Sequence, residues 1–263
     1  MTLWIALILG LVQGLTEFLP VSSSGHLTLL NKIFGIEGNT LLLTILLHVA
    51  TLFAVFFVLR KEIWQLIRHP FSLEARNLYI ATIPTVLIVL LSKGFLEDQF
   101  SSAKLLPYCF ILTAILLAVT NVIDERNKKK NLYYPDQGFR NNVRSSLVMG
   151  IAQGLAVLPG ISRSGSTICA GLLAGENREK TAKFSFLMSI PIILGSMLYE
   201  ILKGDYGTLA STSMIAPLIV AFLSAFLVGI FSIKLMLRVV QNAKYYWFSI
   251  YLVGVSILAF FVV

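Results

Sequence analysis

Two polar segments with a shared pattern contain the residues of this chain that are best suited to chemistry. The first, Gly10–Gly25, reads GLVQGLTEFLPVSSSG and is followed by His26, and the second, Gly150–Gly165, reads GIAQGLAVLPGISRSG. They align without a gap at an offset of 140 residues. The first copy has an acid, Glu17, and the second has a cation, Arg163. We therefore expect one composite site where two repeats of the chain meet.

The acid of the first motif has an amide partner at helical spacing. Gln13 and Glu17 are four residues apart, so a helix places both on one face. An amide oxygen and a carboxylate fit a hard divalent cation, Mg²⁺ or Ca²⁺, with phosphate oxygens and water as its other ligands. Glu17 is thus a candidate metal ligand, a base, or both.

The end of the first motif is suited to binding and attacking a phosphate. Ser22, Ser23 and Ser24 supply hydroxyls, and Gly25 and its neighbours supply backbone N–H groups at the start of the next helix. His26 is close enough in sequence to the serines to act as their base, to attack directly, or to activate water.

The second motif supplies the complementary cation. The guanidinium of Arg163 presents a planar set of donors that fits a phosphate bidentately. Thr167, four residues later, shares its helix face, and the expected phosphate-binding residues here are Ser162, Ser164, Gly165 and Thr167. An alternative interpretation is a structural ion pair between Glu17 and Arg163. The spacing is not that of a nucleotide P-loop.

The composition identifies the elements that position these residues as membrane helices. The chain is 57% hydrophobic and 13% charged, whereas soluble domains carry about 25% charged residues. In a membrane protein, a net charge of +8 indicates basic cytoplasmic loops and not nucleic-acid binding. Cys109 and Cys169 lie in apolar stretches without metal-like spacing and are interpreted as core residues.

We predict an all-α polytopic protein, residues 1–263 forming a single membrane domain. It consists of an inverted-topology repeat of two halves, with six spans and two re-entrant helical hairpins formed by the motifs. The first repeat is 1–123, the hydrophilic cytoplasmic linker is 124–144, and the second repeat is 145–263. The predicted spans are Leu41–Leu59, Asn77–Phe95, Leu105–Ile123, Phe184–Leu202, Met214–Phe231 and Tyr245–Val263. The hairpins comprise apolar stretches Leu3–Leu19 and Leu147–Leu158, each followed by a shorter piece, Leu27–Ile36 or Ile168–Leu173. His48, alone in the first span, is interpreted as a hydrogen-bonded packing residue.

The distribution of basic residues predicts which side of this layout is cytoplasmic. Of the 21 Lys and Arg residues, 16 fall on one side, Lys32, Lys93, Lys104 and Lys203 fall on the other, and Arg163 stays inside. The positive-inside rule makes the basic side cytoplasmic. Both termini and the first hairpin are then expected on the outer side.

The two motifs resemble the signature segments of bacterial undecaprenyl-diphosphate phosphatases, the bacitracin-resistance membrane family. QGLTEFLPVSSSGH and PGISRSGST carry the resemblance, which extends over the whole chain in order and spacing. It implies a metal-binding pair at Gln13 and Glu17, with Gln13 where many members have a second glutamate. It also implies a nucleophile at Ser23 and a phosphate-binding segment from Pro159 to Thr167.

The resemblance implies hydrolysis of undecaprenyl diphosphate to undecaprenyl phosphate and inorganic phosphate, which recycles the lipid carrier for cell-wall synthesis. The enzyme would depend on a divalent cation and act at the periplasmic face of the bacterial plasma membrane, on a polyprenyl diphosphate lipid. We expect Ser23, His26, Glu17 and Arg163 to be catalytic. The rival is a transporter or flippase for a polyprenyl phosphate lipid, and whether the protein forms a homo-oligomer stays open.

Overall fold

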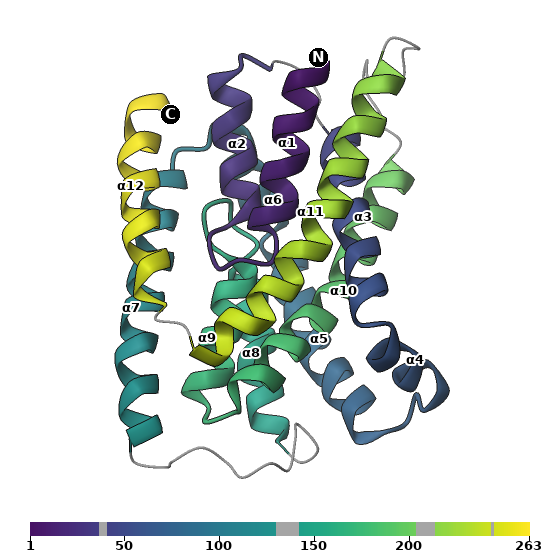
Figure 1. Cartoon of the computed structure of the whole chain (residues 1–263), viewed down its shortest axis with the longest axis vertical. Coiled ribbons are helices and arrows are strands. Elements are labelled where there is room, and N and C mark those ends of the chain that lie inside the picture. The colour runs from purple at the N-terminus through teal and green to yellow at the C-terminus, as the bar shows by residue number, and fades with distance from the viewer. Residues whose placement is uncertain (37–40, 130–141, 204–213, 243–244) are drawn as a thin grey trace.

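A computed structural model describes residues 1–36, 41–129, 142–203, 214–242 and 245–263, and these residues form a bundle of helices (Figure 1). No strand occurs in these ranges, which confirms the all-α prediction. The helices of the first half are α1 (Leu3–Thr16), α2 (Ser23–Ile33), α3 (Leu41–Val58), α4 (Arg60–Arg68), α5 (Leu73–Leu91), α6 (Lys93–Ser102) and α7 (Leu106–Lys129). Those of the second half are α8 (Val143–Leu155), α9 (Arg163–Leu173), α10 (Arg178–Lys203), α11 (Ile215–Asn242) and α12 (Tyr246–Val262).

The sequence repeat reappears as matched helix starts. Helix α2 begins at Ser23 and α9 at Arg163, 140 residues later, and the same offset separates the starts of α7 and α12. Each motif forms a pair of antiparallel helices, α1 with α2 and α8 with α9 (Figure 1). We call residues 17–26 the first tip and residues 156–166 the second tip, so that each tip includes the first turn of the helix that follows it.

Serine caps decide where the second helix of each pair begins. The hydroxyl of Ser22 accepts a hydrogen bond from Gly25 N at 3.3 Å, and that of Ser162 accepts one from Gly165 N at 3.0 Å. These caps satisfy backbone donors that have no partner within the helix. The polar motif residues therefore form the first helical turns, and the two helices begin earlier than the apolar pieces predicted from the sequence.

The two hairpins point in opposite directions and meet at their tips. In Figure 1, α1 and α2 occupy the end of the bundle where both termini lie, whereas α8 and α9 occupy the opposite end. Helix α4, the end of α7 and the start of α8 lie at that opposite end as well. The tips face one another near the middle of the bundle, as expected for an inverted repeat.

Each hairpin packs against a helix of the other half. Helix α1 lies along α11, and α8 lies along α5. A Cβ added to Gly10 would be 2.4 Å from the carbonyl oxygen of Ala221, and one added to Gly150 would be 2.2 Å from that of Ala81. Ala81 and Ala221 are themselves 140 residues apart. The repeated glycines thus allow the same close helix contact in both halves.

The helices are those of a multi-pass membrane protein. Four of the described helices, α5, α7, α10 and α11, are long and apolar enough to cross a membrane on their own. Helices α3 and α4, which meet at a bend of 82°, add a fifth span if the pair is counted as one. Helix α12 is apolar but shorter. All six predicted spans are helical, but the predicted count of six exceeds the count that length and composition alone support.

The boundaries of the second predicted span were wrong. It was expected at Asn77–Phe95, but α5 runs from Leu73 to Leu91 with Pro84 inside it, and α6 begins at Lys93. The hydroxyl of Ser72 caps α5 and accepts from Ala75 N at 3.3 Å, which explains the earlier start. Of the predicted linker, residues 130–141 lie outside the described part of the chain.

Candidate active site where the two tips meet

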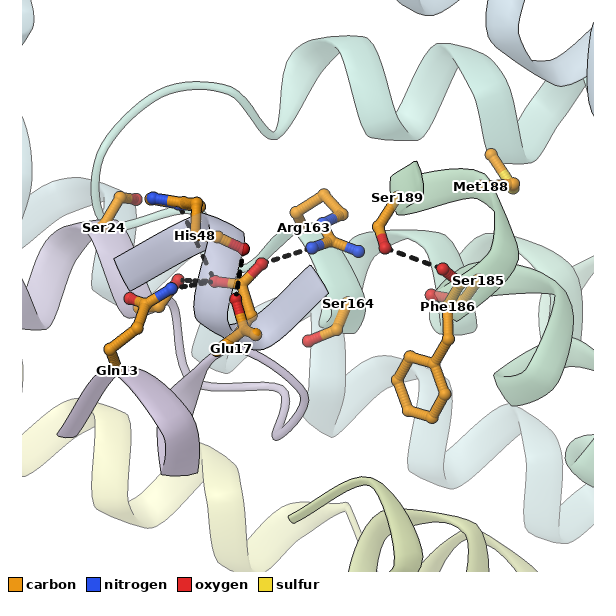
Figure 2. A network of polar contacts seen from close by, with 12 residues as sticks. Gln13, Glu17, Ser24, His48, Arg163, Ser164, Ser185, Phe186, Met188 and Ser189 are labelled. Atoms are coloured by element: carbon orange, nitrogen blue, oxygen red, sulfur yellow. Dashed lines mark hydrogen bonds and ion pairs between the residues drawn. The ribbon is translucent and has the colours of Figure 1, made fainter. Parts of the chain in front are cut away.

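Glu17 is the residue that joins the two tips. It follows the last residue of α1, and its side chain is only 4% exposed. Its Oε1 forms an ion pair with Nη2 of Arg163, and its Oε2 accepts a hydrogen bond from the hydroxyl of Ser23. Nε2 of Gln13 donates to the same Oε2 at 3.1 Å (Figure 2). The structure therefore brings the predicted acid, cation and nucleophile together.

Arg163 keeps one donor for a further partner. It is the first residue of α9 and its side chain is 17% exposed. Nη2 holds Glu17, whereas the buried Nη1 has no hydrogen-bond partner in the described part of the chain. An unpaired buried donor is costly unless a ligand satisfies it. An anion at this position would receive a charge-assisted hydrogen bond from Nη1.

The hydroxyl of Ser23 faces an acid. Ser23 is the first residue of α2 and follows Ser22, whose φ of 70° lies in the left-handed region. This turn places the Ser23 hydroxyl within hydrogen-bond reach of Glu17. In this arrangement the group positioned to take the proton of Ser23 is the carboxylate of Glu17.

His26 is turned away from Ser23 toward helix α12. Its Nδ1 donates to the carbonyl oxygen of Ser22 at 2.7 Å, and its Nε2 lies 2.8 Å from the hydroxyl of Tyr251. The two rings are parallel within 1°, with centroids 5.7 Å apart. Because both ring nitrogens have partners, the structure does not bring His26 onto Ser23. Its role as base, nucleophile or activator of water stays a prediction.

His48 lies closer to the acid than sequence reasoning suggested. It is a hydrogen-bonded residue of α3, as predicted, with Nδ1 donating to the carbonyl oxygen of Thr44 at 2.8 Å. Its Nε2, however, is 3.9 Å from Oε2 of Glu17 (Figure 2). The one available sequence signal was the rarity of an ionisable residue inside an apolar span.

The remaining predicted phosphate-binding residues have partners within the protein. The hydroxyl of Ser164 donates to the carbonyl oxygen of Leu19 at 2.9 Å, which ties the second motif to the first tip. The hydroxyl of Thr167 forms a hydrogen bond with the hydroxyl of Ser185 in α10, with 2.6 Å between the two oxygens. A Cβ added to Gly25 would lie 2.8 Å from the Cα of Gly160, so the tips touch at backbone distance. Neither Ser185 nor Tyr251 was recognised from the sequence.

The donors around Glu17 fit a hard cation that takes few protein ligands. Gln13 is fully buried, and its Oε1 has no hydrogen-bond partner in the described ranges. This amide oxygen and the carboxylate of Glu17 are the expected ligand types. No cluster of three or more His, Cys, Asp and Glu residues occurs in the part of the chain that the structure describes.

The fold and the site define a multi-pass membrane protein with an acid, a hydroxyl and a guanidinium joined at the meeting point of two opposed hairpins. The chain belongs to the family of bacitracin resistance protein BacA, whose sequence pattern matches residues 6–258. It is 44% identical to an undecaprenyl-diphosphatase of Carboxydothermus hydrogenoformans, over 96% of this chain and 95% of that protein. Proteins of the same name from Bacteroides fragilis and Treponema denticola are 42% and 40% identical, over 95% and 98% of this chain and 95% and 96% of their own. The family resemblance seen in the motifs is thereby confirmed.

Proposed function

We propose that this protein is an undecaprenyl-diphosphatase, which hydrolyses undecaprenyl diphosphate to undecaprenyl phosphate and inorganic phosphate. Membership of the family and the names of its relatives support this activity over the rival transport of a polyprenyl phosphate lipid. The observation that carries the proposal is Glu17, which holds the hydroxyl of Ser23 from one motif and the guanidinium of Arg163 from the other.

In the first step, Arg163 holds the terminal phosphate and Ser23 attacks its phosphorus. Nη1 of Arg163 is free to donate to a phosphate oxygen, while Glu17 takes the proton of the Ser23 hydroxyl. The bond from Ser23 Oγ to phosphorus forms as the bond from phosphorus to the bridging oxygen breaks. Undecaprenyl phosphate leaves and takes up the proton that Glu17 received.

In the second step, water releases the phosphate from Ser23. Glu17 takes a proton from the attacking water, the bond from Ser23 to phosphorus breaks, and Ser23 regains a proton as inorganic phosphate departs. Arg163 neutralises charge on the transferred phosphoryl group in both steps, which is the main requirement of this chemistry. His26 holds the start of α2 through its bonds to Ser22 and Tyr251.

Gln13 and Glu17 are the residues that would hold a divalent cation beside this phosphate. The buried, unpartnered Oε1 of Gln13 and its proximity to Glu17 support this assignment. A bound Mg²⁺ or Ca²⁺ would supply positive charge to the phosphoryl oxygens. Arg163, which binds the other carboxylate oxygen of Glu17, would add a second positive charge to the same site.

The activity has a direct test. Purified full-length protein in detergent should release inorganic phosphate from undecaprenyl diphosphate, with added divalent cation and with a chelator as paired conditions. Ser23→Ala protein, purified in the same way, is the control for a contaminating phosphatase. Release by the variant at the wild-type rate, or none by the wild type, would remove the proposed activity.

The proposed membrane layout has six spans and two re-entrant hairpins in the bacterial plasma membrane. Both termini and the first hairpin would lie on the periplasmic side and the linker 124–144 in the cytoplasm, so that the site opens toward the periplasm with the prenyl chain among the spans. The shared end of the two termini supports an even number of crossings (Figure 1). The basic residues of α4 and of the end of α7, which lie at the other end of the bundle, support the orientation (Figure 1).

This layout predicts where reporter fusions will be active. A reporter that needs the periplasm should be active at either terminus and inactive within residues 130–141. A reporter that needs the cytoplasm should show the opposite pattern. A C-terminus on the cytoplasmic side would contradict the six-span layout without bearing on the phosphatase activity.

A further inference from the structure

We propose that His48 is a third protein ligand of the cation held by Gln13 and Glu17, so that the site accepts an ion with both oxygen and nitrogen ligands, such as Mn²⁺. The inference rests on the proposed function only for the presence of a cation beside the phosphate. It extends the ligand set from α1 to the neighbouring helix α3 and replaces the packing role first given to His48.

The distance between His48 and Glu17 suits two ligands of one ion. Nε2 of His48 and Oε2 of Glu17 are 3.9 Å apart, which is too long for a hydrogen bond. It is shorter than about 4.4 Å, which is twice a metal–ligand distance of about 2.2 Å. A single cation between these atoms is therefore able to contact both.

The ring of His48 is held in the orientation typical of a ligating histidine. Nδ1 donates to the carbonyl oxygen of Thr44 at 2.8 Å, which places the lone pair of a neutral ring on Nε2. Histidines that bind metals commonly donate their other ring N–H to a carbonyl in this way. A lone pair that faces the carboxylate of Glu17 is repelled unless a positive group lies between them.

Gln13 provides the independent observation. Its side chain is fully buried, with Nε2 3.1 Å from Oε2 of Glu17 and Oε1 without a hydrogen-bond partner in the described ranges. A half-turn of this amide would bring Oε1 toward Glu17, where both oxygens could share a cation. Three lone pairs, from Gln13, Glu17 and His48, would then surround one position.

The second repeat shows why the amide alone makes no such site. Oε1 of Gln153, which matches Gln13, also lacks a partner in the described part of the chain. The residues that match Glu17 and His48 at the offset of 140 are Val157 and Met188, neither of which is a hard ligand. The cation site is therefore expected in the first repeat only.

The proposed ligands make a prediction about metal preference. Carboxylate and carbonyl oxygens suit Mg²⁺, Ca²⁺ and Mn²⁺, whereas an imidazole adds most to the affinity for transition metals. We therefore expect the wild-type site to prefer Mn²⁺ over Ca²⁺. His48→Gln, which replaces the nitrogen by an oxygen, should reduce that preference by about tenfold or more through weaker binding of Mn²⁺.

Electron spin-echo spectroscopy of Mn²⁺ bound to the full-length protein in detergent tests the ligand directly. The wild type should show modulation from a coordinated ¹⁴N nucleus, and incorporation of ¹⁵N-histidine should change it. The chain has only 3 histidines, so His48→Gln should abolish the signal while the matched variant His26→Gln retains it. If His48→Gln does not fold, loss of the signal in His48→Asn and its retention in His26→Gln decide the question.

The inference is overturned if the wild type binds Mn²⁺ without nitrogen modulation, or if the histidine nitrogen signal survives His48→Gln. Phosphate release measured on the same samples separates this result from the proposed function. Nitrogen modulation without phosphate release would leave the ligand set standing and remove the phosphatase. Phosphate release without nitrogen modulation would support the phosphatase activity and remove His48 from the ligand set.

Discussion

The two tips are built on the same scaffold but carry opposite chemical roles. Each contains the start of a serine-capped helix, and the two helix starts are 140 residues apart. The first carries the acid and the hydroxyl, and its α2 begins with Ser23. The second carries no acid, and its α9 begins with the guanidinium-bearing Arg163 at the position that matches Ser23. Duplication thus supplied the shape, and substitution at a few positions supplied the chemistry.

The interior of the second repeat shows what was not retained. Gln13 donates to the carboxylate of Glu17, whereas Gln153 donates to the hydroxyl of Thr85 at 3.2 Å and to the carbonyl oxygen of Met188 at 3.4 Å. The amide is kept as a helix-packing residue in both halves. Only in the first half does it lie beside an acid, so only this half is expected to bind a cation.

Loss of the attacking group should have the largest effect. Ser23→Ala removes the hydroxyl that donates a hydrogen bond to Glu17 and that attacks the phosphorus. Without it the covalent intermediate cannot form, so phosphate release should fall by more than about a hundredfold. The measurement is release from undecaprenyl diphosphate by purified protein. Ser24→Ala, the adjacent control, should be milder because Ser24 offers at most a hydrogen bond. Equal losses in the two variants would contradict the assignment of Ser23.

The second tip is tested by a change that preserves its charge. Arg163→Lys should lower phosphate release by about a hundredfold, because an ammonium cannot hold both Glu17 and a phosphate with a planar fork. The variant should still fold, as judged by its elution as a single species and by thermal unfolding. Near-normal turnover would return Arg163 to the role of a structural ion pair.

The shared scaffold should respond alike in both halves. Gly10→Ala and Gly150→Ala each place a methyl group against a backbone carbonyl, so each should lower the free energy of unfolding by about 1–3 kcal/mol. Thermal unfolding in detergent measures this. Gly254→Ala is the matched control, because a Cβ there meets nothing within 4 Å. A large cost in one half and none in the other would break the structural equivalence of the repeats.

Two hydrogen-bonding side chains that anchor the tips, Thr113 and Tyr251, should differ in their effects, and loss of the Tyr251 hydroxyl should have the smallest effect of all. Thr113 of α7 accepts from Ser162 N at 3.2 Å and donates to the carbonyl oxygen of Gly160 at 3.1 Å. Thr113→Val leaves both buried groups unpaired and should cost about 1–3 kcal/mol of stability. Tyr251→Phe removes the hydroxyl that is hydrogen-bonded to His26 and should lower the free energy of unfolding by about 1 kcal/mol. The comparison fails if Tyr251→Phe is the more damaging change in thermal unfolding.

Much of this architecture follows from local sequence. The apolar composition predicts membrane helices, and the gapless offset of 140 predicts two equivalent halves. The two caps also depend on local spacing, since the hydroxyl of an N-cap serine reaches the backbone N–H three residues later, but the prediction placed both helix starts four to five residues too late. Ser23, Glu17 and Arg163 were recognisable because polar and charged groups are rare at membrane depth.

Only the tertiary structure decided which of these groups meet. Arg163 reaches Glu17 across 146 residues, and His26 reaches Tyr251 across 225. His48 lies beside Glu17 because α3 and α1 are neighbours in the bundle, and α1 packs along α11 of the other half. Periodicity shows which face of a helix is polar, but the partner of that face depends on how helices from both repeats interlock. This packing brings Arg163 to Glu17 and holds His26 against Tyr251, away from Ser23.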